Sequence, residues 1–111
     1  MEKLLELPNE VQKKLKGLIS LAARQAKVVY GTDNLLQAKH IEIVFMSDSL
    51  SENARKKLNA RFAEIFVSGS IEPLTGKENC KIFGVASGTL AAEIRRNVNL
   101  SFTNAETGAG E

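Results

Sequence analysis

The chain has 111 residues and a net charge of +2, with 43% hydrophobic and 25% charged residues. This is the composition of a soluble globular domain with a single core, and so small a charge does not by itself indicate a nucleic-acid partner. No run approaches the roughly 18 apolar residues of a membrane span, and the single cysteine, Cys80, excludes an internal disulfide. We therefore expect one cytoplasmic domain with no membrane partner.

Residues 9–26 have the periodicity of an amphipathic helix, with Asn9 as the expected N-cap. Apolar residues recur on one face: Val11, Leu15, Leu18, Ile19, Ala22 and Ala26. Four cations fall on the opposite face if the last turn of the helix reaches residue 27: Lys13, Lys16, Arg24 and Lys27. Such a cationic stripe can follow a phosphate backbone, although a solvated helix face explains the same pattern.

Residues 28–30, Val-Val-Tyr, suit a short half-buried strand, and Gly31 permits a tight turn after it. Thr32, Asp33 and Asn34 are N-cap types that precede the apolar pair 35–36, so we expect a helix from here to about residue 39. The free N–H groups at such a helix start can bind an anion such as phosphate. An ordinary connection between a strand and a helix is the alternative.

The rest of the chain continues the alternation of strands and helices. We expect strands at 41–46, 63–67 and 81–86, a helix opened by a Ser-x-x-Glu capping box at 49–52, and a last helix that begins after Ser87, Gly88 and Thr89. Residues 71–79 read as a loop with at most one helical turn, and Gly84 indicates a bulge or a close approach by other atoms.

This order predicts the α/β class: a three-layer α/β/α sandwich on a four-stranded mixed sheet, as a single small domain. We expect residues 1–98 to form the domain and the polar residues 99–111 to be a disordered tail. Ligands gather in such sheets where strands hand over to helices. If the turns at 31–34 and 87–89 lie on the same edge of the sheet, they form one composite surface.

The chemistry of the side chains does not favour an enzyme. The single histidine, His40, has no Cys or acid at the spacing of a catalytic triad or a metal site. The glycines do not form a phosphate-loop motif, and the glutamates are not paired for acid–base work. We therefore expect no catalytic residue, no metal, no cofactor and no small-molecule substrate.

Several segments resemble a known family when they are taken together. They are residues 17–31 (Gly-Leu-Ile-Ser-Leu-Ala-Ala-Arg-Gln-Ala-Lys-Val-Val-Tyr-Gly), 43–48, 51–58, 76–79 (Gly-Lys-Glu-Asn) and 88–91 (Gly-Thr-Leu-Ala). They are similar to bacterial, YlxQ-like members of the ribosomal-protein family that binds kink-turn RNA, the L-seven-Ae type. The resemblance covers roughly residues 17–96 and extends to the C-terminal half of longer bacterial proteins that begin with a YlxR-type nucleic-acid-binding domain.

The resemblance implies an RNA surface made of the turn after the first strand, the helix that follows, and the loop after the last strand. Carried over by position, these are Gly31, Thr32, Asp33, Asn34 and Gln37, and then Ser87, Gly88 and Thr89. The family pattern at the first turn is Gly-x-Asn-Glu-x-x-Lys. This chain keeps the glycine and has Asp33, Asn34 and Gln37 at the other three positions.

Two functions follow from the sequence. The first is a non-catalytic, ribosome- or translation-associated protein that contacts structured RNA through the two turns and the basic helix face. The second is a protein-interaction adaptor on the same fold, in which the altered turn no longer binds RNA. The excess of basic residues lies in the first half of the chain, where residues 1–61 hold 11 Lys and Arg against seven Asp and Glu.

Overall fold

The computed structural model describes the backbone of residues 2–69 and 71–110 and the side chains of residues 2–69 and 71–100. Within these residues the strands are β1 (Glu2–Leu4), β2 (Val28–Tyr30), β3 (Ile41–Ser47), β4 (Ile65–Ser68) and β5 (Ile82–Ala86). The helices are α1 (Asn9–Arg24), α2 (Thr32–Gln37), α3 (Glu52–Arg61), α4 (Glu72–Thr75) and α5 (Thr89–Gly110).

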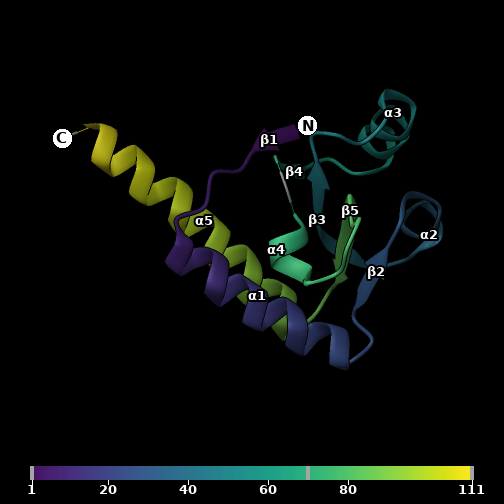
Figure 1. Ribbon diagram of the computed structural model, residues 1–111, viewed down its shortest axis with the longest axis horizontal. Coiled ribbons are helices and arrows are strands. Elements are labelled where there is room, and N and C mark those ends of the chain that lie inside the picture. The colour runs from purple at the N-terminus through teal and green to yellow at the C-terminus, as the bar shows by residue number, and fades with distance from the viewer. Residues whose placement is uncertain (1, 70, 111) are drawn as a thin grey trace.

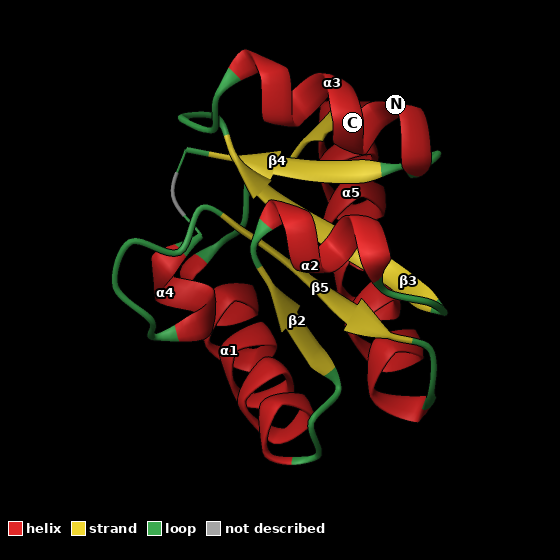
Figure 2. Ribbon diagram, turned by 90° about the vertical axis from the view of Figure 1, so that its right-hand side faces the viewer, coloured by secondary structure: helices red, strands yellow, loops and turns green. Residues whose placement is uncertain are grey.

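One mixed sheet separates two helical layers (Figure 1). Its strand order is β1-β4-β3-β5-β2, in which β4 is parallel to β1 and β3, whereas β5 is antiparallel to β3 and β2. Helices α1, α4 and α5 lie on one face and α2 and α3 on the other, as Figure 2 shows from a second direction. The α/β class is therefore confirmed.

The central strand β3 supplies both cores because its side chains alternate between the two faces. Ile43 and Phe45 join the core under α1, α4 and α5, and Val44 and Met46 join the core under α2 and α3. All four are at most 1% exposed. The nearly continuous apolar run in the sequence indicated this double burial correctly.

The prediction of four strands is wrong, because residues 2–4 add a fifth strand, β1, at the edge of the sheet. It pairs with β4 over three residues, and the chain then buries Leu5 in the core. Nothing in the segment Glu-Lys-Leu alternates, so no local pattern indicates a strand. Main-chain pairing and contacts made by side chains far along the sequence produce it.

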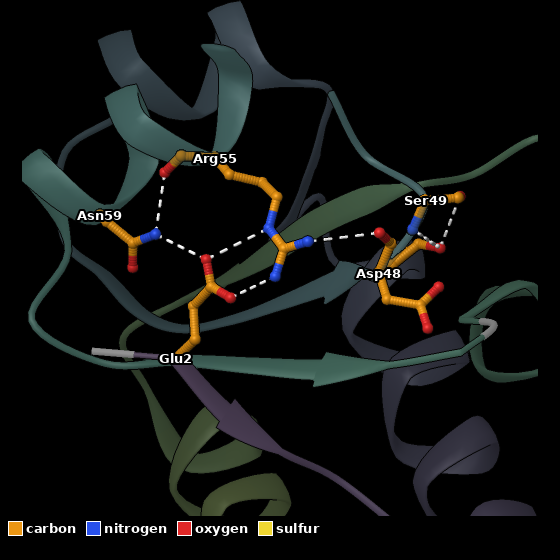
Figure 3. A network of polar contacts seen from close by, with 6 residues as sticks. Glu2, Asp48, Ser49, Arg55 and Asn59 are labelled. Atoms are coloured by element: carbon orange, nitrogen blue, oxygen red, sulfur yellow. Dashed lines mark hydrogen bonds and ion pairs between the residues drawn. The ribbon is translucent and has the colours of Figure 1, made fainter. Parts of the chain in front are cut away.

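Glu2 fastens β1 to α3 through a polar network (Figure 3). The Arg55 guanidinium donates to both carboxylate oxygens of Glu2, and the Asn59 amide donates to one of them at 2.6 Å. The remaining guanidinium nitrogen of Arg55, Nη1, donates to the Asp48 carbonyl at 3.3 Å. Arg55 is therefore engaged within the fold.

The Arg55 guanidinium holds the pKa of the Glu2 carboxyl below its ordinary value of 4.5. A depressed folded pKa contributes stability that is complete above 4.5 and is lost as the pH falls through the lower folded value. We expect Arg55→Met to lower the free energy of unfolding by about 1–2 kcal/mol at pH 7, because it removes charge-assisted hydrogen bonds. Urea unfolding at pH 7 and at acidic pH measures this.

The difference between parent and Arg55→Met is expected to shrink below pH 4.5, where the parent loses the contribution of Glu2. Lys56→Met is the matched control because Lys56 is exposed on the same helix. A difference that stays constant with pH would show that Arg55 stabilises the fold by packing alone.

The start of the first helix differs from expectation. Asn9 is the first residue of α1 and does not cap it, since the cap position is Pro8 and no side chain bonds there. Helix α5 continues to Gly110, so the structure assigns helical backbone to residues for which the composition predicts disorder. The predicted division of the chain at residue 98 stays a prediction. No helix in the described part of the chain is both long and apolar enough to cross a bilayer.

Candidate functional site

The four cations of the predicted stripe are all exposed, but they divide into two groups. Lys13 and Arg24 lie about 16 Å apart along the axis of α1. Lys13 and Lys16 border a hollow of about 270 Å³, which we call the α4 face, lined by Asn9, Gln12, Lys13, Lys16 and Pro73. The methylene next to the Lys16 ammonium comes within 4.0 Å of a Cβ built at Gly76, so this lysine reaches the loop after α4.

Lys27 belongs to the opposite end of the molecule. It borders a hollow of about 500 Å³, which we call the Thr89 hollow, lined by Gln25, Lys27, Ala86, Gly88, Thr89, Leu90 and Ala91. Arg24, at the last residue of α1, lies three residues before Lys27. The Ser87 amide donates to the His40 carbonyl at 2.7 Å, so the turn at 87–89 also touches the start of β3. The structure thus brings Lys27 together with Gly88 and Thr89.

The turns at 31–34 and 87–89 do not lie on the same edge of the sheet, so they do not form one composite surface. Strands β2 and β5 are antiparallel, with Tyr30 opposite Phe83 and Val28 opposite Val85. The turn after β2 therefore lies where β5 begins, and the Gly31 amide donates to the Ile82 carbonyl. The turn after β5 lies where β2 begins. Antiparallel pairing always separates the two C-terminal ends in this way.

The turn after β2 instead faces the loop that precedes β5. Between them lies a hollow of about 270 Å³, which we call the Tyr30 groove, lined by Tyr30, Gly31, Thr32, Lys77, Glu78, Asn79, Cys80, Lys81 and Ile82. Gly76 and Asn79 both have positive φ, at 68° and 61°, and these left-handed residues shape the loop. Lys16 of the α4 face reaches Gly76, the residue before Lys77, so the α4 face adjoins the loop that lines the Tyr30 groove.

The first turn is held by its own polar groups. Gly31 has a φ of 90°, which only glycine adopts readily, and the Asn34 amide donates to the Tyr30 carbonyl at 2.9 Å. Asn34 therefore stabilises the turn, while Asp33 and Gln37 are exposed beyond it. Helix α2 has only six residues, so its dipole is too short to make its N-terminus an anion site by itself.

The cations around the Tyr30 groove and the α4 face have no carboxylate partner among the described residues. The ion pairs of the described part of the chain use other cations, namely Lys3, Arg55, Arg95 and Arg96. Lys13, Lys16, Lys77 and Lys81 are all exposed. This end of the molecule therefore presents four positive charges to an anionic partner, with Glu78 as an acid in the groove.

Tyr30 is the aromatic side chain of this groove. Its ring lies 6.5 Å from the buried Phe83, and the Lys77 ammonium lies 4.1 Å from the ring centroid. Burial raises the pKa of the Tyr30 hydroxyl above its ordinary value of 10.0, with a smaller effect from nearby Cys80. The phenol is therefore neutral at physiological pH and can donate a hydrogen bond.

Sequence reasoning missed Lys77, Asn79 and Lys81 as site residues. They lie in a segment that reads only as a loop, and its glycine and asparagine indicate turns rather than a ligand. The signal that could have found them is the antiparallel pairing of β2 with β5. Had it been expected, it would have placed the loop before β5 beside Gly31. Among the described residues, no group of three or more His, Cys, Asp and Glu side chains is placed to hold a metal ion.

Comparison with known proteins supports the fold. No family model and no curated protein matches the sequence. A solved protein with unknown function from Bacillus halodurans C is similar, with a TM-score of 0.67 and 21% identity over 78% of this chain and 97% of that one. The 15.5 kD RNA-binding protein of Giardia lamblia is similar with a TM-score of 0.61 and 15% identity, over 85% of this chain and 92% of that one.

Proposed function

We propose that this chain is a non-catalytic RNA-binding protein that contacts structured RNA through the Tyr30 groove and the adjoining α4 face. The observation that carries the proposal is the meeting of three separate segments, which places Lys77 and Lys81 beside a groove with an aromatic wall and Lys13 and Lys16 beside the neighbouring hollow. Exposed cations without carboxylate partners suit a phosphate backbone, and an aromatic ring suits an unstacked base.

The similarity to the Giardia lamblia RNA-binding protein supports this proposal through the fold it shares with this chain. The resemblance over residues 17–96 supports a finer version, in which the RNA belongs to the translation machinery and a ribosomal RNA is one candidate. At the first turn the Asn34 side chain already donates to the Tyr30 carbonyl and Gln37 brings no charge, so this turn supplies no cation to an RNA phosphate. In this proposal Lys77 and Lys81 therefore supply the positive charge that pairs with the RNA phosphates.

The test reverses the charge of the α4 face in the double variant Lys13→Glu and Lys16→Glu. We expect binding of a labelled hairpin RNA to weaken by about tenfold or more, and the slope of log K against log salt to fall by about 1.5, because two phosphate contacts are lost. Fluorescence anisotropy over a salt series measures both quantities.

Two matched variants show where the RNA lies. Lys56→Glu with Lys57→Glu changes the same charge on exposed positions of α3, in the other helical layer, and is expected to leave more of the affinity intact. Arg24→Glu with Lys27→Glu tests the predicted contact at the Thr89 hollow, where we expect an intermediate loss. Equal losses in all three would indicate attraction to net charge without a site.

The adaptor function remains the second candidate on one observation: the turn that resembles the family's RNA contact carries Asp33 and a bonded Asn34. A parent protein that binds no structured RNA at low salt would overturn the RNA proposal and favour the adaptor. The exposed large apolar residues Leu4, Leu21 and Leu100 lie on three different elements and give no further indication of a partner surface.

A further inference from the structure

Tyr30 has an environment that differs from that of the other described aromatic rings. Phe45, Phe66 and Phe83 are buried, and Phe62 lies in the other layer with the Arg61 guanidinium 5.6 Å from its ring centre. Tyr30 is half-buried, lines a groove, and is backed by Phe83. Its position is fixed by β2, whose pairing with β5 sets Tyr30 opposite Phe83. The ring is therefore a rigid wall at the surface.

The Lys77 ammonium covers this ring because the loop gives it no stronger partner. No ion pair between described residues involves Lys77, and its charge lies 4.1 Å from the ring centroid. Its backbone is held by a bond from its own amide to the Thr75 hydroxyl at 3.1 Å. The backbone of Lys77 is thus held in place, while its exposed side chain can rotate about four bonds. The ammonium can therefore move away from the ring.

We infer that Tyr30 is a stacking platform for one unpaired nucleobase, and that Lys77 leaves the ring on binding and pairs with a phosphate of the same strand. The inference rests on the proposed function and deepens it. Unstacked bases of RNA loops stack on aromatic side chains, and the contact tolerates any base. A cation over a ring at the protein surface is held more weakly than a stacked base, and a phosphate gives the ammonium a full negative charge to pair with.

The same groove offers groups for the edge of the stacked base. Glu78 and Asn79 both line it, beside Lys77 and Lys81. A carboxylate accepts from amino and imino groups, and an amide both donates and accepts, so these two residues suit the hydrogen-bonding edge of a base. A phosphate alone needs neither of them. The lining therefore suits a base with its phosphate better than a simple anion.

The composition of the chain provides a direct test, because Tyr30 is the only tyrosine and there is no tryptophan. Its fluorescence reports on its own ring, and a base stacked on that ring quenches it. The full chain is titrated with a hairpin RNA that has a single-stranded loop, and tyrosine emission and RNA anisotropy are followed together. A parallel titration of free tyrosine amide with the same RNA corrects for the light that the RNA absorbs. We expect the emission of the protein to fall in step with binding.

Substitutions supply the second readout. Tyr30→Leu is expected to weaken RNA binding by about tenfold, within the range reported for the loss of one stacked base. Tyr30→Phe keeps the ring and is expected to bind within about twofold of the parent. Thermal unfolding of both variants separates a loss of stacking from a loss of fold. The fluorescence titration uses the unmodified chain, so it tests the inference even if a variant fails to fold.

The outcomes separate the inference from the proposed function. Saturating anisotropy with unchanged emission, or Tyr30→Leu binding as well as the parent, would overturn the stacking platform and leave the RNA function standing. No change in anisotropy would overturn both. Free AMP or UMP serves as the other source of a base, and quenching by it at the same concentrations as the RNA would assign the ring to nucleotides and overturn its role in RNA binding.

Discussion

Phe45→Ala is expected to lower the free energy of unfolding by about 3–5 kcal/mol. Phe45 is fully buried in the middle of β3, with its ring 5.0 Å from that of Phe83 and 5.8 Å from that of Phe66. Alanine would leave a cavity between three strands that the helices above cannot fill. The total free energy of unfolding of a domain of this size is only about 5–15 kcal/mol.

Urea unfolding followed by circular dichroism measures this loss. Phe62→Ala is the matched control, because Phe62 is half-buried and packs at the margin of the other core. It removes the same atoms from a partly solvated position, so its cost is expected to be clearly smaller. Equal costs for the two variants would mean that the contacts of Phe45 with Phe66 and Phe83 add nothing to stability beyond those of a half-buried ring.

Gly84→Ala is expected to lower the free energy of unfolding by about 1–3 kcal/mol, although it adds one methyl group. A Cβ at residue 84 would lie 2.5 Å from a terminal methyl of Leu35 and 3.0 Å from a methyl of Ile41. Leu35 is fully buried, so its side chain has little space into which to move. Chemical unfolding of the variant measures the cost.

Gly17→Ala is the matched control for this change. No atom lies within 4 Å of a Cβ added at Gly17, which is exposed in the middle of α1. Alanine there is expected to raise stability by about 0.5–1 kcal/mol through its better helix propensity. A Gly84→Ala protein as stable as the parent would show that Leu35 and Ile41 readjust freely.

Gly84 also bears on the candidate site. It lies in the middle of β5, opposite Val29 of β2 and Val44 of β3. The same strand is preceded by the loop that lines the Tyr30 groove and followed by the turn that lines the Thr89 hollow. Leu35 of α2 packs on β5 at this glycine, and α2 begins directly after the turn that faces Lys77 and Lys81.

Local patterns predicted the elements well. The Val-Val-Tyr strand, the single helical turn within 71–79 and the doubly buried strand β3 are all present, and the close contact at Gly84 is confirmed. These predictions succeed because helix and strand periods, glycine turns and β-branched residues act within a few neighbours along the chain. The exposure of Lys13, Lys16, Arg24 and Lys27 is predictable for the same reason.

The sequence by itself therefore determined most of the helices and strands, and the exposure of Lys13, Lys16, Arg24 and Lys27. Only the tertiary structure decided that Glu2 is drawn into a fifth strand by Arg55 and Asn59. It also decided that the turn at Gly31 meets Lys77 and Lys81 instead of Ser87 and Thr89. The physical reason is that strand direction and edge pairing are settled by contacts between residues some 50 positions apart, and these leave no periodic trace in the chain.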